Sequence, residues 1–151
     1  WYGDKIAVCI PDRLELSHFP KQRQHQDVSP VRFIWFGLSV NRIALFGGLV
    51  NLERLAANGH KIELTICDDR PDQPFQATNM FPIYHTLWTL EQENEIIASH
   101  DIAFLPPYPG AWGRVKSNNK MLTAWACGLP VTDGQHYGFL EEWARSVDHP
   151  E

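Results

Sequence analysis

Short β-type runs alternate with helical patterns along this chain, and the alternation constrains the fold more than any other feature. Apolar runs at 31–36, 61–67, 83–88, 101–105 and 130–132 have the length and composition of strands. Helical patterns occupy 41–58, 90–99 and 117–127, and in the last of these Met121, Leu122 and Trp125 can pack inward. Strands that alternate with helices predict a parallel sheet with crossover helices. We therefore expect an α/β fold, a Rossmann-like three-layer sandwich.

The 151 residues suffice for one domain of ordinary size. We place a Rossmann-like domain at 31–151 and a leading segment at 1–30, which holds a short apolar run at 5–10 and a polar loop at 17–30. A last helix is expected at 137–147. The sequence opens on Trp1 and Tyr2 without an initiator Met. We therefore expect the chain to be a piece of a longer protein.

Composition and charge narrow the possible functions. Hydrophobic residues make up 44% of the chain, enough for a packed core, and the formal net charge is −5. That charge argues against a protein held on nucleic acid by phosphate contacts, but it permits a small basic pocket for a phosphorylated metabolite. No apolar stretch approaches the roughly 18 residues that a membrane span needs. Acidic residues within the first 20 positions argue against a signal peptide.

The cysteines and histidines predict no metal site. Cys9, Cys67 and Cys127 lie far apart, and each adjoins an apolar run. An odd number without a C-x-x-C pair indicates reduced, buried thiols in a cytoplasmic protein. The seven histidines also lack the spacing of metal ligands. We therefore expect neither a metal nor a cofactor.

The strongest candidate for a ligand site is the turn between the strand at 101–105 and the helix at 117–127. It carries Lys116, Ser117, Asn118, Asn119 and Lys120, and in doubly wound sheets ligands lie beyond the carboxyl ends of the strands. Helix N-termini attract phosphates through unpaired N–H groups, and two lysines at such an end are accounted for if an anion also binds. Alternatively, the lysines are solvated and Ser117 only caps the helix. Capping by Ser117 is expected in either case.

A second candidate turn follows the strand at 31–36 and contains Gly37, Ser39 and Asn41. Gly37 would let the backbone approach a phosphate closely. In the alternative interpretation Gly37 only makes the turn and Asn41 caps the next helix. The patterns G-x-G-x-x-G and G-x-x-x-x-G-K-[ST] are absent, which disfavours a nicotinamide dinucleotide and a P-loop.

Other side chains near the expected ligand edge allow more than one interpretation. Trp88 and Trp112 can stack on a base or a sugar, or can belong to the core. Asp68 and Asp69 follow a strand, but their order along the chain differs from that of a phosphoacceptor domain, so we interpret them as solvated loop carboxylates. The sequence shows no Ser-His-Asp or Cys-His arrangement and no convincing catalytic base.

Three stretches resemble one family in the correct order. The run from Lys116 to Val131, KSNNKMLTAWACGLPV, resembles the donor-site helix of GT-B glycosyltransferases, which often carry Lys-x-x-Glu-Ala-x-Ala-x-Gly-x-Pro-Val there. The run DIAFLP at 101–106 is similar to the preceding strand in that family, and Trp35, Phe36 and Gly37 resemble its first C-domain strand and glycine turn. The resemblance covers about 31–133. It implies the C-terminal, donor-binding half of a GT-B enzyme of the group 1 or family 4 type.

The resemblance also implies a site for a nucleotide-diphosphate sugar. Lys120 would match the lysine near the donor phosphates, with the Gly37 turn on the opposite side. Trp88 would border the base, with Trp112 and Thr123 as further base- or sugar-binding positions. The residues expected around the diphosphate are Gly37, Ser39, Asn41, Lys116, Ser117, Asn118, Asn119 and Lys120.

Two departures from the family pattern bear on activity. The usual ribose-binding glutamate falls on Thr123, and its partner eight residues earlier falls on Val115, so the E-x7-E motif is missing. The N-terminal half, which normally binds the acceptor and supplies the catalytic base, is also absent. We therefore expect a domain that is inactive by itself and whose partner is that half. Its expected location is the cytoplasm, with any peripheral attachment to a membrane made through the absent half.

Two other hypotheses remain open at this stage. The first is a non-catalytic GT-B-like module that binds a sugar, a nucleotide or a partner protein. The second is a different GT-B enzyme, such as a sugar-nucleotide epimerase.

Overall fold

Five parallel strands form a single sheet in the order β3-β2-β1-β4-β5 in the computed structural model. The structure describes residues 13–20, 28–111, 113 and 117–134, so the expected strand at 5–10 and the expected helix at 137–147 lie outside the described residues. The parallel sheet confirms the expected α/β, Rossmann-like fold. The strands are β1 Val31–Phe36, β2 Ile62–Asp68, β3 Ile83–Leu87, β4 Ile102–Phe104 and β5 Val131–Thr132.

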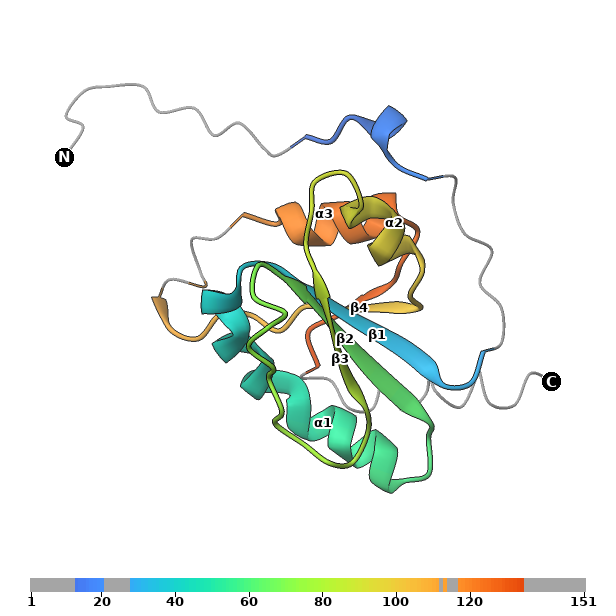
Figure 1. The fold of residues 1–151 in the computed structure, drawn as a ribbon, viewed down its shortest axis with the longest axis vertical. Coiled ribbons are helices and arrows are strands. Elements are labelled where there is room, and N and C mark those ends of the chain that lie inside the picture. The colour runs from blue at the N-terminus through green and yellow to red at the C-terminus, as the bar shows by residue number, and fades with distance from the viewer. Residues whose placement is uncertain (1–12, 21–27, 112, 114–116, 135–151) are drawn as a thin grey trace.

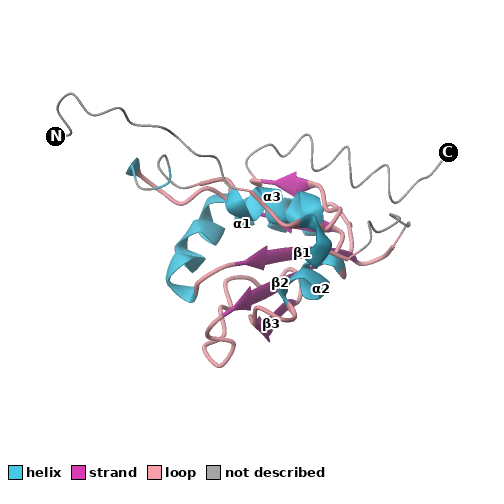
Figure 2. Ribbon diagram, turned by 90° about the horizontal axis from the view of Figure 1, so that it is seen from above, coloured by secondary structure: helices cyan, strands magenta, loops and turns pink. Residues whose placement is uncertain are grey.

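Helices cover both faces of the sheet and complete the three layers (Figures 1 and 2). One helix packs on one face, while the other two lie together on the opposite face. None of the helices in the described residues is long and apolar enough to cross a membrane. The α-helices are α1 Phe46–Ala57, α2 Glu93–Ala98 and α3 Asn119–Ala126, and 3-10 turns lie at η1 Leu16–His18 and η2 Ser39–Leu45.

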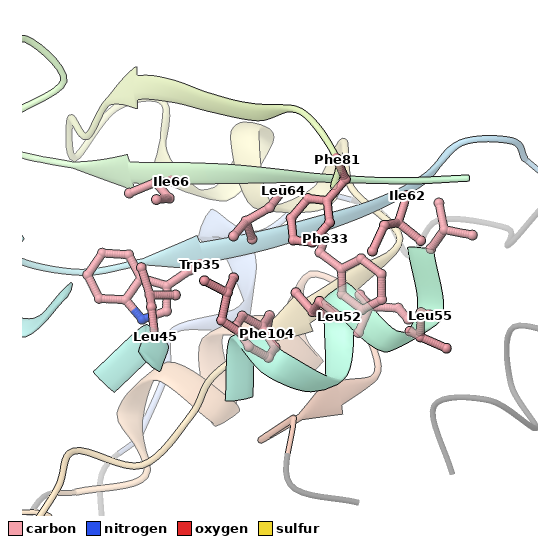
Figure 3. Close-up of a cluster of buried hydrophobic side chains, with 13 residues drawn as sticks. Phe33, Trp35, Leu45, Leu52, Leu55, Ile62, Leu64, Ile66, Phe81 and Phe104 are labelled. Atoms are coloured by element: carbon pink, nitrogen blue, oxygen red, sulfur yellow. The ribbon is translucent and has the colours of Figure 1, made fainter. Parts of the chain in front are cut away.

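The central strand β1 is buried from both sides, and this explains its almost unbroken apolar sequence. Because successive side chains of a strand point to opposite faces, Phe33 and Trp35 join the core beneath α1 (Figure 3). The ring of Phe33 packs edge-on against Phe104. Ile34 and Phe36 belong to the second core, beneath α2 and α3. The predicted bounds of this strand, 31–36, are confirmed.

The connection from β2 to β3 contains no helix in the structure. Residues 69–82 form an irregular loop instead. Phe75 and Ala77 of this loop pack against the core on the α1 side, and Phe81 is one of its buried members. The loop therefore covers part of the face that a crossover helix would otherwise cover.

The face of α3 that is buried differs from the one expected from the sequence. Thr123 and Ala124 are its buried residues, and Cys127, just beyond its end, is buried as well. Trp125, expected to pack inward, is 52% exposed. The expectation for Trp125 was wrong because the face of α3 that is buried carries the small residues Thr123 and Ala124, while Met121 and Leu122 are half-buried.

Two adjacent glycines in α1 provide a matched test of this packing. A Cβ on Gly48 would lie 2.8 Å from Phe104 Cζ and 2.9 Å from the Asp133 carbonyl oxygen, whereas a Cβ on Gly47 would meet nothing within 4 Å. We expect Gly48→Ala to destabilise the fold by about 2 kcal/mol through overpacking. Gly47→Ala should stabilise it by roughly 0.5–1 kcal/mol through helix propensity. Urea unfolding of both variants measures the difference; effects of the same sign would contradict the packing described here.

Candidate functional site

The strand order creates a topological switch point between β1 and β4. The chain moves outward from β1 through β2 to β3 and then returns to place β4 on the other side of β1, with Ile34 paired to Ala103. In open α/β sheets, ligands bind beyond the carboxyl ends of the strands at such a point. Two cavities lie there, and both are lined by residues that follow β1.

The larger cavity has a volume of about 500 Å³. It lies between the loop after β4, the start of α3 and the carboxyl end of β5. Its described lining residues are Trp35, Asn41, Ala44, Leu105, Pro106, Pro107, Tyr108, Gly113, Ser117, Asn118, Asn119, Lys120, Met121, Val131 and Asp133.

The smaller cavity has a volume of about 280 Å³. It lies between the turn after β1, the residue that follows β3 and the first residues of α2 and α3. Its lining residues are Phe36, Gly37, Leu38, Asn41, Asp69, Trp88, Glu93, Asn119, Lys120 and Thr123.

Three polar side chains line both cavities: Asn41, Asn119 and Lys120. The Lys120 ammonium lies 4.8 Å from the centroid of the Trp35 ring, a cation–π distance. The ammonium also lies against the turn after β1, where a Cβ on Gly37 would overlap Lys120 Nζ as it is placed. Two turns that are far apart in sequence thus place one positive charge at the boundary of the cavities.

The start of α3 differs from the prediction. The helix begins at Asn119, and Asn118 occupies the N-cap position without a side-chain capping hydrogen bond. Ser117 therefore does not cap the helix, and that expectation was wrong. Ser117 and Asn118 line the larger cavity instead. Lys116, Trp112 and Val115 lie outside the described residues.

The Gly37 turn is organised by a carboxylate. The backbone N–H of Ser39 donates a hydrogen bond to Asp69 Oδ1 at 2.7 Å, and this bond lowers the pKa of Asp69. Ser39 lines neither cavity, and its N–H group is already bonded to Asp69. Of the residues predicted in this turn, Gly37 lines the smaller cavity and Asn41 lines both.

Asp68 is not the solvated carboxylate that the sequence suggested. Its side chain is fully buried and forms an ion pair with Arg42, whose side chain is only 12% exposed. Arg42 Nη2 donates to Asp68 Oδ1 at 2.9 Å, and the guanidinium also donates to the carbonyl oxygens of Arg70 and Gln73. This pair joins η2 to the end of β2 and to the loop at 69–82.

Loss of that ion pair should lower the free energy of unfolding. Arg42→Met would leave Asp68 buried without its counter-charge, so we expect a loss of about 3 kcal/mol in the free energy of unfolding. Arg54 on α1 is exposed, and Arg54→Met should change stability by less than about 0.5 kcal/mol. Urea denaturation compares the two. Similar midpoints for both variants would show that the Arg42 pair does not contribute as described.

His85 on β3 also holds the loop at 69–82, through a hydrogen bond to its backbone. Its Nε2 accepts a hydrogen bond from the Phe75 backbone N–H at 3.1 Å, and its buried Nδ1 has no hydrogen-bond partner among the residues that the structure describes. Burial lowers the pKa of His85, and the nearby Arg42 guanidinium acts in the same direction. The folded protein therefore favours the neutral imidazole.

This preference predicts a loss of stability in mild acid. The contribution of His85 is complete above its unfolded pKa of 6.5 and is lost as the pH falls from there through the lowered folded value. We expect the free energy of unfolding to fall between about pH 7 and pH 5. His85→Gln keeps an acceptor for Phe75 but does not titrate, so its stability should depend less on pH over that interval. Identical pH profiles for the two proteins would contradict this assignment.

The structure brings together most of the predicted residues that it describes. Trp88, which is 37% exposed, and Thr123, which is 8% exposed, both line the smaller cavity. The Thr123 hydroxyl donates to the Asn119 carbonyl oxygen at 3.0 Å, so one of its hydrogen-bonding functions is already used.

Four polar side chains that line the cavities were not predicted from the sequence: Asp69, Glu93, Tyr108 and Asp133. Asp69 and Asp133 each follow a strand closely, and this position was a usable signal. Glu93 is the first residue of α2, and nothing in its local sequence indicates that it reaches the site.

Comparison of the chain with protein-family models, with curated proteins and with solved structures found no match. Among the described residues, no group of three or more His, Cys, Asp and Glu side chains could hold a metal ion. Cys67 and Cys127 are buried, and burial raises the pKa of each thiol to about 12, so neither is a reactive thiolate at neutral pH.

Proposed function

We propose that this domain binds a nucleotide-diphosphate sugar and forms the donor-binding half of a glycosyltransferase. The single observation that carries the proposal is the position of the Lys120 ammonium, which lies against Gly37 where the two cavities meet. The diphosphate of such a ligand needs a positively charged group to bind it, with a cavity on each side of that group. One cavity would hold the nucleoside and the other would hold the sugar. The two cavities flank such a group.

Neutral donors at the same boundary support a diphosphate. The amide side chains of Asn41 and Asn119 line both cavities, and an amide nitrogen can donate two hydrogen bonds to phosphate oxygens. The start of α3 faces the same place without a side-chain cap, and the partial positive charge of a helix N-terminus favours an anion. These groups would stabilise the charge that develops on a diphosphate leaving group during sugar transfer.

The resemblance noted in the sequence supports the choice of this enzyme class over other phosphate-binding domains. Four of the positions compared with the GT-B donor site, Gly37, Trp88, Lys120 and Thr123, line the smaller cavity together. Catalysis would then require a base from the acceptor-binding half, and the described domain by itself would hold the donor without transferring the sugar.

One observation favours the second candidate, a non-catalytic module that binds a sugar or a nucleotide. Thr123 replaces the glutamate of the family pattern, and its hydroxyl is bonded to the helix backbone. A domain that retained the phosphate boundary but lost this glutamate could still bind nucleotides. The two candidates differ in transfer activity once the acceptor-binding half is supplied, and both require the site at Lys120.

Removal of the Lys120 charge tests the shared site. Lys120→Met keeps much of the aliphatic packing on Trp35 and removes the ammonium, so we expect nucleoside diphosphates and nucleotide sugars to bind at least about tenfold more weakly. Isothermal titration calorimetry at fixed ionic strength measures the change. The matched control is Lys61→Met, because Lys61 is exposed and immediately precedes β2. It therefore lies at the amino ends of the strands, away from the cavities.

Two results would argue against the proposal. Equal weakening by both lysine variants would indicate a general effect of net charge. Absence of binding to the unaltered protein by every nucleotide tested at millimolar concentration would remove the proposed ligand class.

A further inference from the structure

The smaller cavity combines groups that disfavour a phosphate with groups that suit a nucleoside. Leu38 and the Trp88 side chain form apolar walls, while Asp69 and Glu93 contribute two carboxylates. Carboxylates repel a phosphate at short range but accept hydrogen bonds from hydroxyl groups. The neutral end of a nucleotide therefore fits this cavity, and the charged end fits the Lys120 boundary.

Glu93 is half-buried and lines the smaller cavity. In agreement with this position, its charge adds to the effect of burial in raising the pKa of both Cys67 and Cys127, which lie on β2 and just after α3. Within the part of the chain that the structure describes, no hydrogen-bond or ion-pair partner of this carboxylate is found.

Trp88 is held in place at the same cavity. Its backbone N–H donates to the Asp68 carbonyl oxygen at 2.8 Å, which extends the β2–β3 pairing to this residue. Because the residue is 37% exposed, the side chain keeps surface available for a ligand. Base stacking on an aromatic ring tolerates every base, since each base has a π-face.

Size and charge together assign the two ends of the ligand. The smaller cavity, about 280 Å³, is near the lower limit of roughly 300 Å³ for small-molecule sites and is too small for a whole nucleotide sugar. The larger cavity, about 500 Å³, offers the polar side chains of Ser117, Asn118 and Asp133. A sugar with many hydroxyl groups suits that lining better than the apolar walls of Leu38 and Trp88.

We propose that the smaller cavity binds the nucleoside, with the base on Trp88 and a ribose hydroxyl donating a hydrogen bond to Glu93. This inference rests on the proposed function and adds an orientation to it. The nucleoside lies toward α2, the diphosphate lies at Lys120, and the sugar lies in the larger cavity. Glu93 is then the residue that distinguishes a ribonucleotide from other diphosphates.

The test compares ligands that contain and lack the nucleoside. ADP, GDP, UDP and inorganic pyrophosphate are titrated by calorimetry into the full chain and into Glu93→Gln, with Glu95→Gln as the control. Glu95 lies on the same short helix, is exposed and lines neither cavity. The 2′-deoxy and 3′-deoxy forms of the tightest diphosphate are titrated as well.

We expect at least one nucleoside diphosphate to bind about tenfold or more tightly than pyrophosphate. Glu93→Gln should remove most of this advantage and should not weaken pyrophosphate, since it removes a negative charge from the site. One deoxy form should lose about tenfold in affinity to the unaltered protein, because a hydrogen bond to a charged acceptor is lost. Glu95→Gln should behave as the unaltered protein.

The outcomes separate this inference from the function on which it rests. If pyrophosphate and the nucleoside diphosphates bind with equal affinity, and Lys120→Met weakens both, the proposed nucleoside site is wrong. The proposed phosphate site would still be supported by that result. Absence of binding by every ligand would overturn both. Should Glu93→Gln fail to fold by circular dichroism, Trp88→Leu supplies the same comparison, and an unchanged nucleoside advantage in that variant would overturn the assignment.

Discussion

A buried ion pair determines how the loops above the sheet are held. Asp68, the last residue of β2, is fully buried, and its charge is compensated by Arg42 from η2. A buried carboxylate without such a partner would be strongly unfavourable, so the end of β2 and η2 must lie together. The same guanidinium donates to the backbone of the loop at 69–82. The neighbouring residue, Asn41, is thereby placed at the wall between the two cavities.

Separation of charge is the main electrostatic feature of the site. The Lys120 ammonium lies over Trp35 at the boundary, while Asp69 and Glu93 lie in the smaller cavity. An arrangement with the positive group central and the carboxylates to one side does not suit a simple anion, which would meet repulsion on that side. It suits a ligand that is charged in the middle and neutral at its ends, as a nucleotide-diphosphate sugar is. This match is the physical basis for both proposals.

Most of the fold could be predicted because its elements depend on local patterns. The strand at 31–36 is a short run of large apolar residues ended by a glycine, and its bounds were correct. The site was only partly predictable. Gly37 and Lys120, which line the smaller cavity, were predicted from their positions at strand-to-helix turns, whereas Glu93 was missed because its position at that cavity depends on how α2 packs beside α3. Asp68 was misinterpreted as solvated together with Asp69, because the sequence alone does not distinguish a buried carboxylate from an exposed one.

The sequence by itself determined the order and type of the elements, and with them the parallel sheet and the edge at which a ligand would bind. These follow from hydrophobic periodicity and turn residues, which act over a few positions along the chain. Only the tertiary structure decided that the Lys120 ammonium lies against the Gly37 turn, that Arg42 neutralises Asp68, and that Ser117 does not cap α3. Each of these depends on distances between residues far apart in the chain, or on where a helix begins relative to the sheet. Local sequence does not specify such distances, because they are set by the packing of whole elements against one another.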